Sequence, residues 1–204
     1  MCQENDAKAN STKESILDTC VRLFAKFGYA RVSMRDIASA VGVQAASIYY
    51  YFKSKEDILE SIFQTCVDER RASLVKLVET MEQTEDVSLR ELLANTRHYT
   101  NDGSGDLHDL ALLIAMHDIT FDPKSVRFVQ EMLFVPIDTI LVPFLQRRLE
   151  QNEAETWDIT AFGCILKSFL FSEAILKFTE LRCSQDTMDG GFDMIASMIP
   201  LAHS

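Results

Sequence analysis

Apolar residues recur at steps of three and four between residues 33 and 55, which is the spacing of one buried face of an α-helix. The first set ends just before Gly42, whose access to positive φ suits a tight turn between two helices. A second set begins at Ile48, so the pattern predicts two short helices joined by a sharp turn. The apolar positions of the two helices are Met34, Ile37, Ala38, Val41, Ile48 and Phe52.

The residues at the predicted crossing are suited to a helix-turn-helix. Ala38 is small enough to let two helices cross closely, Gly42 turns the chain, and the branched side chain of Ile48 can anchor the second helix. Ser33 offers an N-cap for the first helix with Asp36 three residues later. The spacing therefore predicts a compact helix-turn-helix unit.

Helical signals flank this unit on both sides. Ser54 repeats the cap pattern, so a third helix is expected to leave from Lys55 and to continue to about Met81. On the other side, Ser11 is the predicted cap of a helix whose apolar face ends before Gly28. We expect residues 1–10 to form a disordered tail.

Residues 12–59 contain the motifs Phe27-Gly28, Ser33 to Val41, Gly42-Val43, Ile48 to Phe52 and Lys53 to Glu56. In these motifs the segment resembles the N-terminal domain of the TetR family of transcriptional regulators. Three positions depart from the family pattern, namely Gln44, where Ser or Thr usually caps the helix, Ala45, where Lys is frequent, and Ala46, where Gly is frequent. The resemblance implies an all-α regulator with residues 11–57 as a helix-turn-helix DNA-binding domain and residues 58–204 as an effector-binding and dimerisation body, about nine helices in all.

Candidate DNA contacts lie around the second helix of the motif. The amide of Gln44 can bond adenine bidentately in the major groove, and Ala45 or Ala46 can meet a thymine methyl group. A rotation of ~100° per residue cannot bury three consecutive tyrosines. The resemblance implies that Tyr49 and Tyr50 face DNA, although Tyr49 or Tyr51 could pack inside instead. The predicted contacts are Ser33, Arg35, Gln44, Ala45, Ala46, Ser47, Tyr49, Tyr50, Tyr51 and Lys55.

Two of the predicted contacts are basic. Lys55 stands at a helix N-terminus and is predicted to bind phosphate, helped by the helix dipole. Arg35, like Arg31, could touch phosphate or could be an ordinary solvated charge. These alternatives remain open at the level of the sequence.

The body is predicted to be helical throughout. Helices are expected at Leu89–Thr100 and Leu107–Phe121, followed by one capped by Asp122-Pro123 and kinked by Pro136 and Pro143. On Leu107–Phe121 the expected apolar face is Leu110, Leu113, Ile114 and His117. A broadly apolar helix, Ala154–Leu181, and a last helix, Met188–Leu201, resemble the dimerisation pair of the family. The resemblance thus implies a homodimer on a near-palindromic double-stranded operator.

The resemblance also implies an unidentified small-molecule effector bound in the body. Candidates for the pocket lining are Arg97, His98, Tyr99, Met116, His117 and Phe128. Each could equally be ordinary core or surface, because sequence gives no pocket geometry. A regulator controlled by a protein partner or by thiol oxidation is a further alternative.

Net charge divides unevenly along the chain. The total is −11, yet residues 1–60 hold eight basic and eight acidic residues, whereas residues 61–204 hold twelve basic and 23 acidic residues. The acidic body should repel nucleic acid and keep non-specific affinity low.

Other chemistry is sparse. The pairs His108-Asp109 and His117-Asp118 invite a metal or enzyme interpretation, but nine residues place the two histidines on opposite sides of a helix. We therefore expect no catalytic residues, no metal and no cofactor, with a helical metal-binding protein or enzyme containing a helix-turn-helix as the alternative. The five cysteines lack a Cys-x-x-Cys pair and suggest reduced thiols. No uninterrupted apolar window has the length of a membrane span, which favours a cytoplasmic protein.

Overall fold

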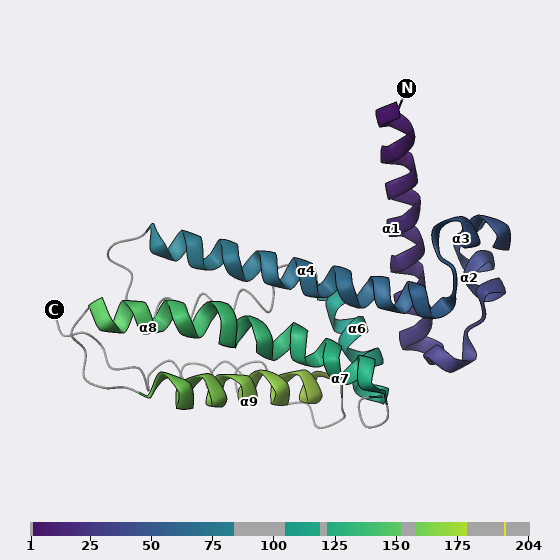
Figure 1. Ribbon diagram of the computed structural model, residues 1–204. Helices are drawn as coiled ribbons and strands as arrows, with labels where there is room; N and C mark the ends of the chain where they lie inside the picture. The colour runs from purple at the N-terminus through teal and green to yellow at the C-terminus, as the bar shows by residue number, and fades with distance from the viewer. Residues whose placement is uncertain (1, 84–104, 119–121, 152–157, 179–193, 195–204) are drawn as a thin grey trace.

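The computed structural model describes residues 2–83, 105–118, 122–151, 158–178 and 194 (Figure 1). No strand occurs within these residues, so the predicted all-α class is confirmed. The helices expected at Leu89–Thr100 and Met188–Leu201 lie outside the described residues. The elements are α1 (Cys2–Phe27), η1 (Tyr29–Arg31), α2 (Met34–Val41), α3 (Ala45–Tyr51), α4 (Lys55–Glu82), α6 (Gly105–Asp118), α7 (Pro123–Val129), η2 (Gln130–Phe134), η3 (Ile137–Leu141), α8 (Val142–Gln151) and α9 (Ile159–Phe178).

Helix α4 runs from the N-terminal domain into the body. Figure 1 shows α1 crossing the beginning of α4, with α2 and α3 beside that end, while α8 and α9 run beneath the remainder of α4. The 28 residues of α4 keep the apolar period that the sequence predicts from Lys55 to about Met81. One continuous helix therefore connects the N-terminal domain to the body.

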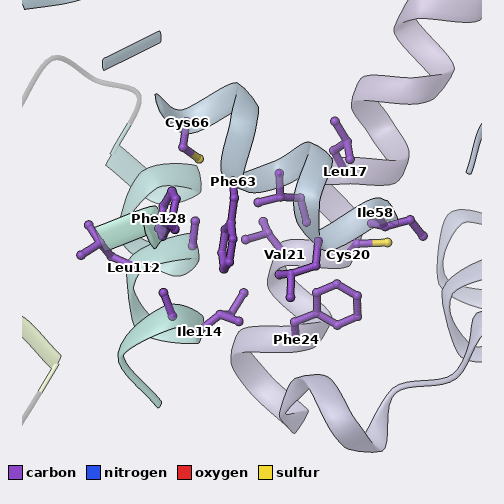
Figure 2. Packing of buried hydrophobic residues seen from close by; sticks show 14 of the residues in the cluster. Leu17, Cys20, Val21, Phe24, Ile58, Phe63, Cys66, Leu112, Ile114 and Phe128 are labelled. Atoms are coloured by element: carbon purple, nitrogen blue, oxygen red, sulfur yellow. The ribbon is translucent and has the colours of Figure 1, made fainter. Parts of the chain in front are cut away.

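The first hydrophobic core joins the N-terminal domain to α6 and α7. It contains Phe24 of α1, Ile37 of α2, Ile48 of α3 and Phe63 of α4, and it continues without interruption into the body. Figure 2 shows the ring of Phe63 against that of Phe128, and the two rings stack with centroids 4.1 Å apart. Because Phe24, Ile37 and Ile48 share this core with Phe128, packing extends across the boundary that we expect between residues 57 and 58. The residues that α6, α7 and η2 contribute to this core are Ala111, Leu112, Ile114, Ala115, Phe128, Val129, Met132 and Leu133.

A second core lies further along α4. Leu74, Val78 and Met81 of α4 pack there with residues of η3, α8 and α9, including Phe144 and Phe162. Gly163 is buried in α9, where a Cβ atom would lie 3.0 Å from Val142 of α8, so the missing side chain permits close approach. Because α4 contributes to both cores, a displacement of one end of this helix acts on both.

Two expectations about helices are wrong in detail. The expected tail is helical, since α1 begins at Cys2 and Ser11 lies inside it. No proline or glycine interrupts residues 2–10, so the helix can extend past the predicted cap. On α6 the exposed side chain is His117, while Leu110 and Leu113 are only partly buried. The buried face is instead that of His108, Ala111, Leu112, Ile114 and Ala115, because α6 packs between α1 and α4.

The two prolines are accommodated by π-helical turns rather than by a break. The N–H of Val135 donates to the carbonyl of Gln130, and the N–H of Val142 donates to that of Ile137, each five residues back. Each of these donors directly precedes a proline, Pro136 or Pro143. Such a turn holds one extra residue, which leaves room where a proline ring would otherwise meet the preceding turn.

The segment Pro123–Arg147 is long and apolar enough to cross a membrane by length and composition, with mean hydropathy 1.6. Half of its most apolar window is buried inside the protein, as in the core helix of a soluble protein. This signal is therefore weak evidence for a membrane span.

The stacked rings generate a stability prediction. Phe63→Ala should lower the free energy of unfolding by about 3–5 kcal/mol, because it opens a cavity between α4 and α7. Val75→Ala, at an exposed position of the same helix, should change it by less than about 0.5 kcal/mol. Urea unfolding followed by circular dichroism measures both. Equal stability of the two variants would contradict a shared core.

Candidate nucleic-acid interface

The first helix of the motif is fixed by the predicted capping box. The N–H of Asp36 donates to Ser33 Oγ at 3.2 Å, and the N–H of Ser33 donates to Asp36 Oδ2 at 2.8 Å. Ser33 Oγ also donates to Asp36 Oδ2 at 2.6 Å. Hydrogen bonds from the side chain and backbone of Ser33 hold the pKa of Asp36 below its ordinary value. The Ser33 hydroxyl is thus engaged in the cap, and its predicted DNA contact stays a prediction.

The turn between α2 and α3 has the conformation that the glycine predicts. Gly42 has φ 79° and ψ 28°, and its N–H donates to the carbonyls of Ala38 at 3.0 Å and Ser39 at 3.3 Å. The N–H of Val43 also donates to Ala38 at 3.0 Å. Ala38 and Ile48 are buried. The sharp turn and the close crossing of α2 and α3 are therefore confirmed.

Helix α3 presents a polar and aromatic outer face. Gln44 is its N-cap residue but makes no side-chain capping bond, so the amide stays available at the surface. Tyr50 is 82% exposed and Tyr49 54% exposed, so neither ring is packed inside. Tyr51 is half-buried against the core and meets the Tyr50 ring edge-on at 5.0 Å. The interior alternative thus applies to Tyr51 and not to Tyr49.

Among the smaller predicted contacts, Ala46 and Ser47 are exposed and Ala45 is partly buried against the core. Arg35 is exposed on α2, as is Arg31 at the end of η1. The exposed candidates for DNA contact in the motif thus include Arg31, Arg35, Gln44, Ala46, Ser47, Tyr49 and Tyr50.

Lys55 is oriented differently from the expectation. Its Nζ donates to the carbonyls of Tyr29 at 2.7 Å, Val32 at 2.8 Å and Ala30 at 3.4 Å, and it lies 4.3 Å from the centre of the Tyr29 ring. Burial lowers the pKa of Lys55 below its ordinary value. An ammonium group has three donors, so this conformation leaves none for a phosphate. Lys55 anchors the segment that leads into α2, and a phosphate contact would require it to leave these carbonyls.

Lys53 is a cation that the sequence reasoning passed over. Its side chain is exposed in the turn between α3 and α4, and its backbone N–H donates to Asp57 Oδ2 at 2.8 Å, which fixes the turn. It stands three residues after Tyr50, whereas Lys55 stands at the N-terminus of α4. The signal that could have found it is its place outside the apolar period, directly after buried Phe52.

The predicted effector residues are not gathered in one cavity among the described residues. Arg97, His98 and Tyr99 lie outside these residues. Met116 is partly buried against the first core, His117 is exposed, and Phe128 is stacked on Phe63. Their role in a pocket stays a prediction.

A shallow groove of about 200 Å³ lies between α4 and the π-helical turns. It has an ion pair at its rim, where Arg127 Nε donates to Glu131 Oε1 at 2.8 Å. Of the predicted pocket residues that the structure describes, none lines this groove. Its lining residues are Gln64, Val67, Asp68, Arg71, Arg127, Glu131, Val135, Pro136 and Thr139.

The histidines and cysteines of the described ranges differ in their exposure. These ranges contain no group of three His, Cys, Asp or Glu side chains placed to hold a metal ion. His108 is buried with Nε2 3.1 Å from Glu69 Oε2, while His117 is exposed, as expected for opposite sides of α6. Burial raises the pKa of the Cys20 and Cys66 thiols to about 12, which disfavours the reactive thiolate. Cys164 is exposed on α9.

Comparison with known proteins supports the interpretation of this surface. Residues 16–62 match the family model of bacterial regulatory proteins, tetR family. The chain is 36% identical over 64 residues to the HTH-type transcriptional regulator AcrR of Shigella flexneri, covering 31% of this chain and 30% of AcrR. It is 39% identical over 56 residues to IcaR of Staphylococcus aureus, the negative transcriptional regulator of the biofilm operon icaADBC, covering 28% and 30%. The match thus spans about 30% of the length of these relatives.

The whole fold also has a solved counterpart. The TetR-family transcriptional regulator PfmR from Thermus thermophilus superposes with a TM-score of 0.62 at 21% identity, covering 89% of this chain and 93% of PfmR. This similarity extends the shared fold from the N-terminal domain to the body.

The anchoring of Lys55 generates a prediction that separates it from Lys53. Lys55→Met should lower the free energy of unfolding by about 1–2 kcal/mol, because it removes the donor from partly buried carbonyls. Lys53→Met should change it by less than about 0.5 kcal/mol, since that side chain is exposed. Thermal and urea unfolding of both variants measure this difference. A Lys55→Met variant with an unchanged free energy of unfolding would rule out an anchoring role for Lys55.

Proposed function

We propose that this chain, whose residues 16–62 belong to the TetR family of bacterial regulatory proteins, is a sequence-specific DNA-binding transcriptional regulator that acts as a repressor. The observation that carries the proposal is the exposed face of α3 on a capped helix-turn-helix, within the segment that matches the family model. The name of IcaR as a negative regulator favours repression.

The face of α3 divides into readout and anchoring roles. Gln44, at the start of the helix with its amide unused, is placed to read a base edge in the major groove. Tyr49 and Tyr50 can donate hydroxyl hydrogen bonds to phosphates, and Lys53 supplies a charge at the far end of the helix. Phosphate contacts set the register of α3, and Gln44 supplies sequence preference.

Dimerisation through α9 completes the proposal. One face of α9 is exposed along the helix and combines small side chains with the apolar side chain of Ile165, which is 42% exposed. TetR-family regulators act as dimers on DNA operators. A twofold pair of α3 helices would read two half-sites of a near-palindromic operator. The residues of this face are Ala161, Cys164, Ile165, Ser168 and Ser172.

We further propose release by a small-molecule effector, as in other regulators of this family. An effector acts only if it binds one arrangement of the two DNA-binding domains better than the other. The shared core of α4, α6 and α7 offers a route, because a shift of α6 or α7 must move the packed start of α4. Control by a partner protein or through exposed Cys164 remains the second mechanism. Family members are cytoplasmic in general, and we assign this chain to the cytoplasm.

Titration of DNA variants at fixed salt tests the roles in the interface. Gln44→Ala should change base preference, with about 1–3 kcal/mol lost at one position of the site. Lys53→Ala should weaken binding to all sequences and should reduce the slope of log affinity against log salt by about 1. Equal losses of Gln44→Ala on every sequence would remove Gln44 as a base reader.

Substitution of the exposed α9 face tests the dimer. Ile165→Arg should raise the dimer dissociation constant by at least about 100-fold, because two guanidinium groups would be buried at the twofold interface. Val75→Arg, a comparable change at an exposed apolar position of α4, should leave the dimer intact. Sedimentation equilibrium distinguishes them, and an Ile165→Arg dimer of normal affinity would place the interface elsewhere.

A further inference from the structure

An ion bridge connects the body to the beginning of α4. Lys124 lies in the first turn of α7, and its Nζ donates to carboxylate oxygens of both Glu56 and Glu60, the latter at 2.5 Å. Glu56 and Glu60 are one helical turn apart on α4, so a single ammonium group can hold both. These two carboxylates raise the pKa of Lys124 above its ordinary value.

The helix end that carries Lys124 is itself held firmly. Asp122 caps α7, accepting from the N–H of Lys124 at 3.3 Å and of Ser125 at 3.0 Å. Ser125 is buried and also donates its hydroxyl to Asp122 at 2.8 Å. Three residues further on, Phe128 stacks on Phe63. Movement of α7 would therefore be transmitted to Lys124.

The α4 side of the bridge adjoins the segment that leads into α2. Glu56 follows Lys55, whose ammonium group holds the carbonyls of Tyr29 and Val32. Burial raises the pKa of Tyr29 above its ordinary value, and the charges of Glu56 and Lys124 also act on this pKa. A chain of contacts thus runs from the α7 cap through α4 to the start of α2.

We propose that Lys124 is a positioning residue for DNA binding, which holds the first turns of α4 against α7 and thereby sets the angle of the helix-turn-helix to the body. In a dimer this angle fixes the distance between the two α3 helices, and so the half-site spacing that the protein accepts. The inference rests on the proposed function as a dimeric DNA-binding regulator.

The ion bridge is suited to adjusting the angle of the helix-turn-helix rather than to stabilising the fold. The side chains of Lys124, Glu56 and Glu60 are 48%, 61% and 54% exposed, and ion pairs so exposed contribute little to folding. The stacking of Phe63 on Phe128 keeps α7 attached to α4 when the bridge opens. The bridge can therefore open and close without unfolding the domain, and salt in solution weakens it.

Another bridge on α4 provides a matched control. Arg147 of α8 donates to Glu82 at 3.0 Å at the opposite end of α4, and its side chain is 57% exposed. Arg147→Met removes an ion pair of similar exposure between α4 and the body, far along α4 from the helix-turn-helix. Lys124→Met keeps the aliphatic stem while removing the charge.

The experiment measures affinity against half-site spacing. The probe is the duplex that the unmodified full-length protein selects from a randomised pool, rebuilt with one or two base pairs inserted between its half-sites. One base pair turns a half-site by about a tenth of a helical turn, so the unmodified protein and Arg147→Met should each lose about tenfold in affinity. Lys124→Met should lose about threefold or less, because its helix-turn-helix can re-orient.

A second pair of substitutions removes the same bridge from the other side. Glu56→Gln combined with Glu60→Gln should broaden the spacing profile as Lys124→Met does, and circular dichroism checks that all variants are folded. Spacing profiles of Lys124→Met and of the glutamine variant that coincide with that of the unmodified protein would overturn the inference and leave the proposed function standing. Failure of the unmodified protein to select any duplex would overturn the proposed function, and this inference with it.

Discussion

The structure depends on α4 being buried in two cores at once. Its first half packs with α1, α2, α3, α6 and α7, and its second half packs with η3, α8 and α9. The N-terminal domain therefore has no separate interior, because its Phe24, Ile37 and Ile48 share one core with Phe128 of the body. A packed interface of this kind resists continuous deformation and moves between discrete arrangements, which is what control of DNA binding from the body requires.

The net charge is distributed unevenly between the two parts of the chain. The first 60 residues are neutral overall, and the remaining residues carry the whole net charge of −11. A neutral domain with Arg31, Arg35 and Lys53 exposed can approach phosphate locally, while the acidic body discourages contact elsewhere on DNA. Lys55 is withdrawn from this exposed set by the carbonyls of Tyr29 and Val32. Under the proposed function, affinity for DNA depends on few contacts, so the placement of those contacts matters more than their number.

The sequence predicted those structural features that depend on residues close together in the chain. The Ser33 and Asp36 capping box, the turn at Gly42 and the length of α4 depend on spacings of a few residues, and all three are present. The sequence did not predict the features that depend on contacts between distant segments. Lys55 contacts carbonyls more than 20 residues away, and the buried face of α6 depends on its packing against α1 and α4. Neither feature can therefore be predicted from the pattern of neighbouring residues. The π-helical turns before Pro136 and Pro143 fall between these cases, since proline predicts a disturbance but not its form.

Two kinds of contact join the body to the helix-turn-helix, and they suit different tasks. The apolar core that Phe24 and Ile37 share with Phe128 costs much free energy to separate, so it keeps the two parts of the chain together. Exposed ion pairs such as Lys124 with Glu56 and Glu60 contribute little to stability but are directional, so they select one arrangement among several that the core tolerates. The proposed function needs both, because it requires a DNA-binding domain that stays attached to the body while its angle to the body changes. The sequence shows the apolar contacts as periodicity, whereas the ion pairs become visible only when the helices are placed in space.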